Sequence, residues 1–285
     1  MNNIKNVLSI FNGIGVGQFV LDELGINYEN YFSSEINKNC NKLTSEKFKN
    51  LKHLGDVKFV KGHELPKIDL LIGGSPCQGF SSAGKNLNFE DERSKLFFEY
   101  YRILKELRSL NPNILFFLEN VPMKKESEDI ISDFLGVEPF ELKAEFFVPQ
   151  KRKRIFWTNI KFDKKIEKID YKISDFIEGI GFATNAKLEL NPRRIFFKKT
   201  NIFGTITASY YKGISGSSRP AVSVKEGYLD EDRESHRSLT VNEIEKIFGL
   251  PKNYTEGFSK TERMKMLGNS WEFNSIKFFF KNLCS

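Results

Sequence analysis

The chain has 285 residues, of which 40% are hydrophobic and 28% are charged. This length suits one large domain, or one domain with a smaller insertion, and the composition is sufficient for a hydrophobic core. The longest uninterrupted apolar run, Ile114 to Leu118, is too short to span a bilayer, and the N-terminus lacks the features of an export signal. Three cysteines and three histidines are scattered along the chain, which argues against a structural zinc site or a disulfide framework. We therefore expect a cytoplasmic protein with no metal and no membrane contact.

The formal net charge of the chain is +7 at pH 7, and its isoelectric point is about 9.1. A basic protein of this kind is compatible with a polyanionic partner such as a nucleic acid. An equally good explanation is that a genome rich in A and T encodes many Lys, Asn and Ile residues. Charge alone therefore leaves both explanations open.

Strands and helices alternate through the first half of the chain. Val7 to Phe11 is typical of a buried strand, the glycine turn Asn12 to Gly15 follows it, and a helix is expected over Val16 to Leu24. The later elements expected here are a strand near Tyr31 to Ser34, a helix from about Lys38, a strand at Ile68 to Ile72, a helix at Ser94 to Leu110, a strand at Ile114 to Leu118 and a strand pair at Phe146 to Val148 and Ile155 to Trp157. This alternation predicts an α/β fold with a doubly wound, mostly parallel sheet.

The pattern changes in the second half of the chain. From about Lys161 to Ser238, short mixed segments and paired basic residues replace the alternation of strands and helices. Helical character returns at Val241 to Phe248 and in the amphipathic segment Ile276 to Leu283. We therefore expect a main domain made of residues 1–160 and 239–285, and a small irregular subdomain at residues 161–238.

Three features at successive strand ends favour a nucleotide-type ligand. The glycine turn lies between a strand and a helix, where glycines permit a tight turn and close approach of the backbone to a ligand. Glu35 ends the second strand and is well placed to accept both hydroxyls of a ribose, and Asp56 in the next unit is placed to accept from an adenine amino group. Each feature alone is compatible with a plain turn or an exposed loop carboxylate. Together they favour an adenosine ligand.

A cysteine and a carboxylate follow two neighbouring apolar strands. Cys77 lies in a loop, Gly73 to Ser81, directly after the strand Ile68 to Ile72. Ligands of open α/β sheets bind beyond the carboxyl ends of the strands, so this thiol faces the expected site, whereas the other two cysteines keep the usual explanation of small buried residues. Glu119 follows the next apolar strand, where a carboxylate is costly to bury unless it is used or paired. A nucleophilic thiol and an acid on neighbouring strand ends fit covalent catalysis.

A basic run extends from Gln150 to Arg154. Its simplest explanation is a solvated charged patch. In a strand, however, Gln150, Arg152 and Arg154 would share one face, because side chains alternate between the two faces. Two guanidinium groups on that face would bind a phosphate or a base carbonyl. Both interpretations remain open from the residues alone.

Taken in this order, the motifs resemble those of the DNA cytosine-5 methyltransferases. The resemblance is carried by Phe11, Pro76-Cys77-Gln78, Glu119-Asn120-Val121, Gln150 to Arg154, Leu239-Thr240, Phe248 to Pro251 and Leu267 to Ser270, and it covers about three quarters of the chain. Within the family, the catalytic domain of the eukaryotic de novo enzymes is most similar, through Leu96 to Arg102, Thr205-Ile206-Thr207 and Ser270-Trp271. The chain has no room for the regulatory modules of those enzymes, so we expect a free-standing bacterial or phage type, in the cytoplasm of a bacterium or an infected host cell.

The resemblance implies a class I, Rossmann-like fold that binds S-adenosyl-L-methionine and releases S-adenosyl-L-homocysteine. Residues 1–160 and 239–285 would then form the catalytic domain, and residues 161–238 the target-recognition subdomain that contacts double-stranded DNA. The residues that the resemblance assigns to the cofactor are Phe11 and Trp271 as packing partners, Glu35 at the ribose, Asp56 and Val57 at the adenine, and Gly13, Gly15 and Ser270 at the methionine end.

The resemblance also implies a catalytic role for each polar residue. Cys77 would attack C6 of a cytosine flipped out of the duplex, Glu119 would hold N3 and the exocyclic amine, and Arg154, with Arg152 behind it, would hold O2. C5 would then take the methyl group, and loss of the C5 proton and of the thiol would complete the cycle. The loop Gln78 to Glu92 is a candidate lid over the flipped base. The other residues expected to contact the substrate are Ser75, Pro76, Gln78, Ser81, Asn120, Lys212 and Arg219.

Two features qualify the likeness to the de novo enzymes. Ser209 stands where those enzymes carry an arginine that reads guanine, so CpG specificity is not expected to carry over. Lys212 and Arg219 are candidate replacements, with ordinary phosphate contacts as the alternative. The pair Phe97-Phe98 resembles a subunit contact of the family and suggests a homodimer, with core packing as the alternative.

Three other functions are weighed against DNA methylation. A tRNA cytosine-5 methyltransferase would share the same scaffold, although the basic insert and the ending typical of the de novo enzymes favour DNA. A non-catalytic DNA-binding relic is disfavoured because Cys77, Glu119, Arg154 and the cofactor acids are all present. A nicotinamide-dependent oxidoreductase is disfavoured because the glycine spacing differs from the dinucleotide-binding pattern.

Overall fold

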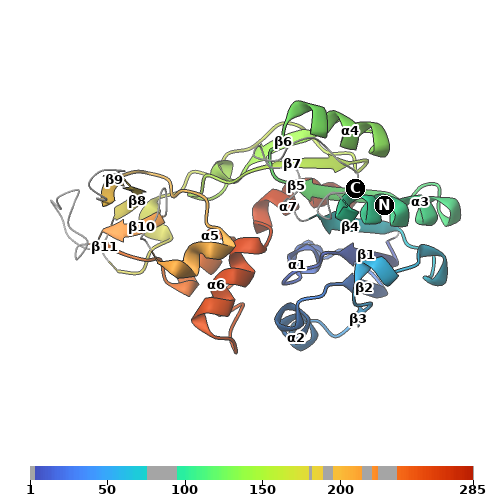
Figure 1. The fold of residues 1–285 in the computed structure, drawn as a ribbon, viewed down its shortest axis with the longest axis horizontal. Helices are drawn as coiled ribbons and strands as arrows, with labels where there is room; N and C mark the ends of the chain where they lie inside the picture. The colour runs from blue at the N-terminus through green and yellow to red at the C-terminus, as the bar shows by residue number, and fades with distance from the viewer. Residues whose placement is uncertain are drawn as a thin grey trace. The chain divides into compact units, whose positions relative to one another are not determined.

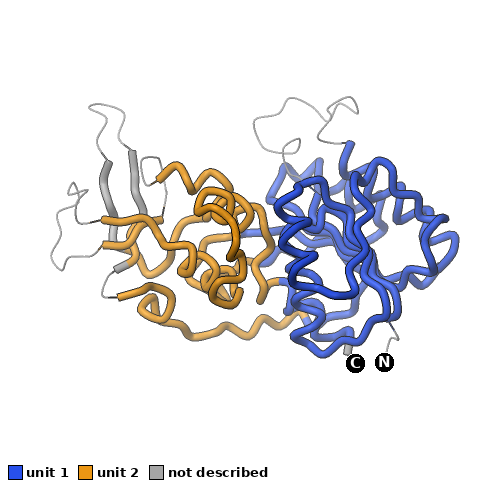
Figure 2. The backbone as a smooth tube through the Cα atoms, turned by 90° about the horizontal axis from the view of Figure 1, so that it is seen from below, with its two compact units in different colours: residues 1–142, 153–163, 276–285 blue, residues 143–152, 164–275 orange. Residues whose placement is uncertain are grey.

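The computed structural model describes residues 4–75, 95–179, 182–188, 195–213, 220–223 and 236–284. The chain forms two compact units, of which unit 1 contains residues 1–142, 153–163 and 276–285 and unit 2 contains residues 143–152 and 164–275 (Figure 2). Residues 239–275, which the sequence groups with the main domain, thus belong by compactness to unit 2. The functional division at residues 161 and 238 stays a prediction.

Unit 1 is built on a seven-stranded sheet with the strand order β3-β2-β1-β4-β5-β7-β6 (Figure 1). Its strands are β1 (Asn6–Ile10), β2 (Asn30–Ser34), β3 (Leu51–His53), β4 (Leu70–Gly74), β5 (Leu115–Asn120), β6 (Phe140–Lys143) and β7 (Lys153–Thr158). The first five strands pair in parallel, and β7 pairs antiparallel to β5. Its helices are α1 (Val16–Glu23), α2 (Lys38–Lys47), α3 (Lys95–Leu110), α4 (Lys125–Leu135) and the last residues of α7 (Phe273–Phe280). The predicted mixed α/β fold with a mostly parallel sheet is confirmed.

The core of unit 1 forms where α3 packs on the sheet. One stripe of α3, with the helical spacing of Phe97, Tyr100, Leu104 and Leu107, is completely buried in the same cluster as side chains of β1, β4 and β5. Each such buried apolar side chain stabilises the fold by roughly 1.5–3 kcal/mol relative to exposure. Phe97 is therefore a core residue, which agrees with the packing alternative, and Phe98, half-buried, packs against Phe97 and Phe134 of α4.

The opposite face of β5 is covered by aromatic residues from the other end of the chain. The ring of Phe117 lies 5.2 Å from that of Phe279 and 5.1 Å from that of Phe280, measured between ring centroids. Phe156 of β7 completes this group, at 5.4 Å from Phe117. The amphipathic segment predicted at Ile276 to Leu283 is thus part of the core of unit 1.

The structure corrects one predicted strand and lengthens another. Phe146 to Val148 is not a strand, because a short 3-10 helix (Ala144–Phe146) ends there and the amides of Phe147 and Val148 both donate to Ala144 O. The strand that the sequence places there is β6, immediately before this helix. β5 continues two residues beyond Leu118, so Glu119 lies inside the strand and not after it.

Unit 2 contains an antiparallel sheet that the sequence does not predict. Its strand order is β11-β10-β8-β9, with β8 (Phe182–Leu188), β9 (Ile195–Lys199), β10 (Pro220–Ser223) and β11 (His236–Arg237). Beyond the sheet lie a short 3-10 helix η5 (Ala208–Lys212) and the helices α5 (Val241–Ile247) and α6 (Lys260–Asn269). The segment expected to be irregular is therefore partly a small sheet.

The described residues contain neither a membrane-spanning helix nor a cluster of metal ligands. None of their helices has both the length and the apolar character needed to cross a membrane. No group of three or more His, Cys, Asp or Glu side chains among them is arranged to hold a metal ion.

Candidate active site

The glycine turn after β1 has an unusual backbone conformation. Phe11, Gly13 and Gly15 all have positive φ angles, of 58°, 55° and 78°. For a bulky residue such as Phe11 this conformation costs about 1–3 kcal/mol, and strain of this kind is concentrated at ligand-binding sites. A side chain at Gly15 would collide with Phe48, since a Cβ atom there would lie 2.7 Å from its ring. Packing therefore requires glycine at position 15, whereas Gly13 has open space around it among the described residues.

Glu35 is fixed next to this turn by backbone donors. One carboxylate oxygen accepts from Gly13 N at 2.8 Å, and the other accepts from Ile36 N at 2.9 Å and Asn37 N at 2.8 Å. A carboxylate offers about four acceptor positions, so one of them remains for a ligand hydroxyl. The two predicted cofactor elements, the glycine turn and Glu35, are thus brought together.

Asp56 lies at the start of the short 3-10 helix η1 (Val57–Phe59), and the residue before it is hydrogen-bonded to the end of β2. One of its oxygens caps η1 by accepting from Lys58 N at 3.0 Å. Its second oxygen has no hydrogen-bond partner among the described residues. The preceding residue is tied to β2, because Ser34 Oγ donates to Gly55 O at 2.8 Å. Asp56 and Glu35 therefore follow neighbouring strands at the same edge of the sheet.

The geometry of these residues fits an adenosine ligand. The Nδ2 atom of Asn12 is buried and has no hydrogen-bond partner in the described part of the chain, which is a costly arrangement for a polar atom. Two large apolar side chains, Ile36 and Phe59, are 73% and 79% exposed beside Glu35 and Asp56 respectively. The sequence analysis did not select Asn12, Ile36 or Phe59. A large apolar residue one to three positions after each acid is the signal that would have found the last two.

Glu119 and Asn120 connect the ends of β4 and β5. The sheet register places Glu119 opposite Gly74, the last residue of β4. Asn120 Nδ2 donates to the hydroxyl of Ser75 at 2.9 Å, and both residues are buried. Ser75 is the last described residue before Cys77, so Asn120 binds a residue two positions before the predicted nucleophile.

Arg154 of β7 pairs directly with Glu119. Its Nε lies 2.8 Å from a carboxylate oxygen of Glu119, and both side chains are more than four-fifths buried. A charge-assisted contact of this kind, shielded from water, is stronger than a surface ion pair. Its Nη1 donates to Lys153 O at 2.7 Å, and Nη2 has no partner among the described residues. The acid and the guanidinium predicted to bind one base are thus adjacent in unit 1.

Arg152 lies in unit 2, where its buried guanidinium joins distant parts of the chain. It donates to Ser270 O at 2.7 Å and to Ile206 O at 3.3 Å. β7 begins only at Lys153, so Gln150 and Arg152 do not lie in a strand with Arg154, which is a correction to the face that the sequence suggests. The contact of Arg152 with the substrate stays a prediction.

The other predicted residues of unit 2 lie near the ends of α6 and η5. Ser270 is buried, its hydroxyl donates to Leu267 O at 2.8 Å, and Trp271 next to it is half-buried. Lys212 Nζ lies 6.0 Å from the ring centroid of Tyr211, and Lys265 Nζ lies 4.8 Å from the same ring. This aromatic ring with two ammonium groups is the kind of surface that contacts a nucleic acid backbone. Lys265 was not selected from the sequence because its partner is 54 residues away.

Several predicted residues lie outside the described parts of the chain. These are Pro76, Cys77, Gln78, Ser81 and Arg219, together with the candidate lid Gln78 to Glu92. Their roles stay predictions.

We expect Cys40 to resist alkylation in the folded protein. It is buried in α2, and burial, together with the negative charge of Glu35, raises the pKa of its thiol to about 12. At pH 8 only about one thiol in ten thousand would be ionised, and the thiolate is the reactive form. Peptide mass spectrometry after iodoacetamide treatment should find Cys40 unmodified in the native protein and fully modified in urea. Similar modification in both states would contradict this assignment.

Comparison with known proteins shows the family. The family model described as C-5 cytosine-specific DNA methylase matches residues 5–187 and 183–285. The type II methyltransferase M1.ScrFI of Lactococcus lactis subsp. cremoris is 28% identical in an alignment that covers 93% of this chain and 74% of that protein. The type II methyltransferase M.DsaV of Dactylococcopsis salina is 28% identical in an alignment that covers 98% of this chain and 85% of that protein.

Solved structures show the same fold. The Entamoeba histolytica methyltransferase EhMeth superposes with a TM-score of 0.76 at 20% sequence identity, over 98% of this chain and 99% of that chain. The two chains therefore share the mixed α/β fold with its mostly parallel seven-stranded sheet. Because the family model spans nearly all of the sequence, the chain belongs to the C-5 cytosine-specific DNA methylase family and is a DNA cytosine methyltransferase.

Proposed function

We propose that the protein transfers a methyl group from S-adenosylmethionine to C5 of a cytosine flipped out of duplex DNA, through a covalent adduct with Cys77. The observation that carries this proposal is the buried pair Glu119 and Arg154 beside the hydrogen bond from Asn120 to Ser75. The sheet register pairs Glu119 with Gly74, and Cys77 is three residues further on, so the chain keeps its Cα within about 11 Å of the Cα of Gly74. This covalent limit supports the assignment of the thiol of Cys77 to the region of unit 1 that holds Glu119 and Arg154.

The cofactor is assigned to the edge of the sheet that carries the glycine turn. Glu35 keeps an acceptor position for a ribose hydroxyl, and Asp56 keeps a free oxygen for the adenine amino group. When bound, S-adenosylmethionine supplies an electrophilic methyl group on its sulfonium. Ser270 and Trp271 keep the roles that the family implies, as predictions.

In the proposed reaction, the protein activates the base from both sides of its ring. The thiolate of Cys77 adds to C6, while Glu119 shares a proton with N3 and holds the exocyclic amine, so the electron pair of the ring moves to C5. With the cofactor bound, C5 would take the methyl group as the carbon–sulfur bond of the sulfonium breaks and S-adenosylhomocysteine leaves. A base would then remove the C5 proton, and the electrons of that C–H bond would restore the ring double bond as the thiolate leaves. An ordinary thiol with a pKa near 8.5 is only a few per cent ionised at pH 7, so the loop amides and Arg154 have to favour the thiolate.

Base flipping explains why the site needs fixed polar groups. C5 and C6 cannot be reached inside a stacked duplex, and extrusion of the base costs a few kcal/mol. Glu119 and Arg154 are already paired, so these donors and acceptors are oriented before the base arrives. In unit 2, the ring of Tyr211 with Lys212 and Lys265 is assigned to the DNA backbone. We place this activity in the cytoplasm of a bacterial or phage-infected cell.

The proposal is tested by methyl transfer to two nucleic acids. The full-length protein is incubated with S-adenosylmethionine labelled in the methyl group and with either duplex DNA or total tRNA. We expect label in DNA only, as 5-methylcytosine, and a covalent complex that survives detergent when the duplex contains 5-fluorocytosine. Label in tRNA alone would identify an RNA methyltransferase. DNA binding without label or adduct would identify a non-catalytic relic.

A further inference from the structure

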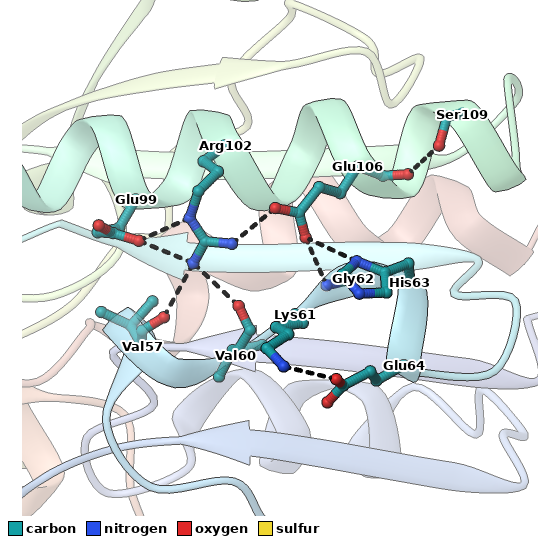
Figure 3. A network of polar contacts seen from close by, with 10 residues as sticks. All are labelled: Val57, Val60, Lys61, Gly62, His63, Glu64, Glu99, Arg102, Glu106 and Ser109. Atoms are coloured by element: carbon teal, nitrogen blue, oxygen red, sulfur yellow. Dashed lines mark hydrogen bonds and ion pairs between the residues drawn. The ribbon is translucent and has the colours of Figure 1, made fainter.

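The polar side of α3 contacts the segment that follows Asp56. Figure 3 shows Glu99, Arg102 and Glu106 on successive turns of α3, facing the residues from Val57 to Glu64. Arg102 Nε donates to Glu99 at 2.9 Å, and its Nη1 donates to Glu106 at 2.7 Å. These three side chains are a quarter to a third exposed, so the network is partly shielded from water.

Arg102 also reaches the backbone of this segment. Its Nη2 donates to Val60 O at 2.9 Å and to Val57 O at 3.2 Å, in addition to an ion pair with Glu99 (Figure 3). The planar guanidinium group of arginine has five N–H donors that point in different directions. A lysine ammonium at this position has only three donors and would lose some of these hydrogen bonds. Arg102 is therefore fitted to the backbone carbonyls, and its two carboxylate partners hold it in that orientation.

Glu106 binds the other side of the same segment. It accepts from Gly62 N at 2.6 Å through the oxygen that Arg102 does not use. The backbone approaches α3 closely there, since a Cβ atom at Gly62 would lie 2.9 Å from Cβ of Glu106. Residues 57 to 62 are thus attached to α3 at three backbone atoms.

This attachment fixes η1 at both ends. Asp56 caps the N-terminal end of η1 by accepting from Lys58 N. Arg102 binds the C-terminal end by donating to Val57 O and Val60 O. The side chain of Val57 is buried, so η1 cannot turn without breaking these contacts. The position of the free oxygen of Asp56, and of the exposed Phe59, depends on the position of η1.

We propose that Arg102 is a positioning residue that holds η1, and with it Asp56, in the conformation that binds the adenine of the cofactor. This inference rests on the proposed use of S-adenosylmethionine. Without Arg102, η1 samples other conformations, and the apparent affinity falls in proportion to the population that remains competent. The substitution leaves Cys77 and Glu119 unchanged, so methyl transfer from bound cofactor should proceed as in the wild type.

The test compares Arg102→Gln with Lys105→Gln, which removes one positive charge from an exposed position of the same helix. Calorimetry should show S-adenosylhomocysteine binding about tenfold weaker in Arg102→Gln, and unchanged binding in Lys105→Gln. The KM for S-adenosylmethionine should rise by a similar factor, whereas kcat at saturating cofactor should stay within about twofold. Hydrogen exchange should become faster at amides 58–62 of the free protein, with the strands of the sheet unchanged.

The outcomes distinguish a failure of the proposed function from a failure of the positioning role of Arg102. If the wild-type protein does not bind S-adenosylhomocysteine, the proposed function fails. If it binds, and Arg102→Gln binds equally well or loses kcat in place of affinity, the positioning role is refuted. Should Arg102→Gln not fold, Arg102→Lys decides, because it keeps the charge between Glu99 and Glu106 but loses the fork. Unchanged affinity in that variant would refute the role, and a severalfold loss would support it.

Discussion

Replacing Cys77 with alanine is expected to lower the rate of methyl transfer by about 10⁴-fold or more, as for the loss of a covalent nucleophile in other enzymes. The alanine side chain cannot add to C6, so C5 of the cytosine does not become nucleophilic. Binding of S-adenosylhomocysteine should stay within about twofold of wild type, because Glu35 and Asp56 lie at other strand ends. Single-turnover transfer of labelled methyl groups to duplex DNA, together with calorimetry, measures both quantities.

The matched control for this variant is Cys40→Ala. Cys40 is buried in α2 and has no role in the proposed reaction, so this variant should keep activity close to wild type. Substantial methyl transfer by Cys77→Ala, or an intact covalent complex with 5-fluorocytosine DNA, would refute the proposed mechanism. Loss of cofactor binding in that variant would show that the cysteine loop has a different role.

Replacing Gly268 with alanine should destabilise unit 2 more than the same change at any other described glycine of that unit. Gly268 lies in α6, and a Cβ atom there would lie 2.2 Å from the backbone carbon of Thr207 and 2.3 Å from Ala208 N. Backbone atoms cannot turn aside as a flexible side chain does, so α6 has to move away from η5. Overpacking costs 1–3 kcal/mol and sometimes more, and we expect about 3 kcal/mol or more here. Thermal unfolding should shift down by about 6–12 °C.

Asn269→Ala is the matched control, since the neighbouring side chain is exposed. Its melting temperature should stay within about 2 °C of wild type, because surface changes seldom exceed ±0.5 kcal/mol. An equally small shift for Gly268→Ala would show that α6 and η5 are not in such close contact. The glycine in the motif Leu267 to Ser270 thus has a steric explanation within unit 2.

Much of unit 1 could be predicted because its strands are short apolar runs bounded by turn residues. Such runs identify β1, β4 and β5, and the polar residues at their ends follow directly. The contact of Glu35 with the glycine turn could also be expected, since parallel neighbouring strands end at the same edge. The pairing of Glu119 with Arg154 depends on β7 running antiparallel to β5, which the sequence does not specify.

The remaining features depend on residues far apart in the sequence. Arg152 bonds to carbonyl groups 54 and 118 residues away, and no local pattern indicates such partners. The error at Phe146 to Val148 has a local cause, because apolar residues suggest a strand while Pro149 lacks the amide needed to continue a ladder. The sequence indicates Arg102 only as part of the motif Leu96 to Arg102. Its positioning role could not be predicted, because its carbonyl partners lie more than 40 residues away.

The aromatic cover of β5 has a consequence for how the protein is made. Phe117 is buried against Phe279 and Phe280, which leave the ribosome more than 160 residues after it. During synthesis the face of β5 that carries Phe117 therefore lacks this cover until Phe279 and Phe280 have been made, and exposed apolar surface of this kind favours aggregation or chaperone binding. A nascent chain arrested just before Phe279 should be far more sensitive to protease than one released after Leu283.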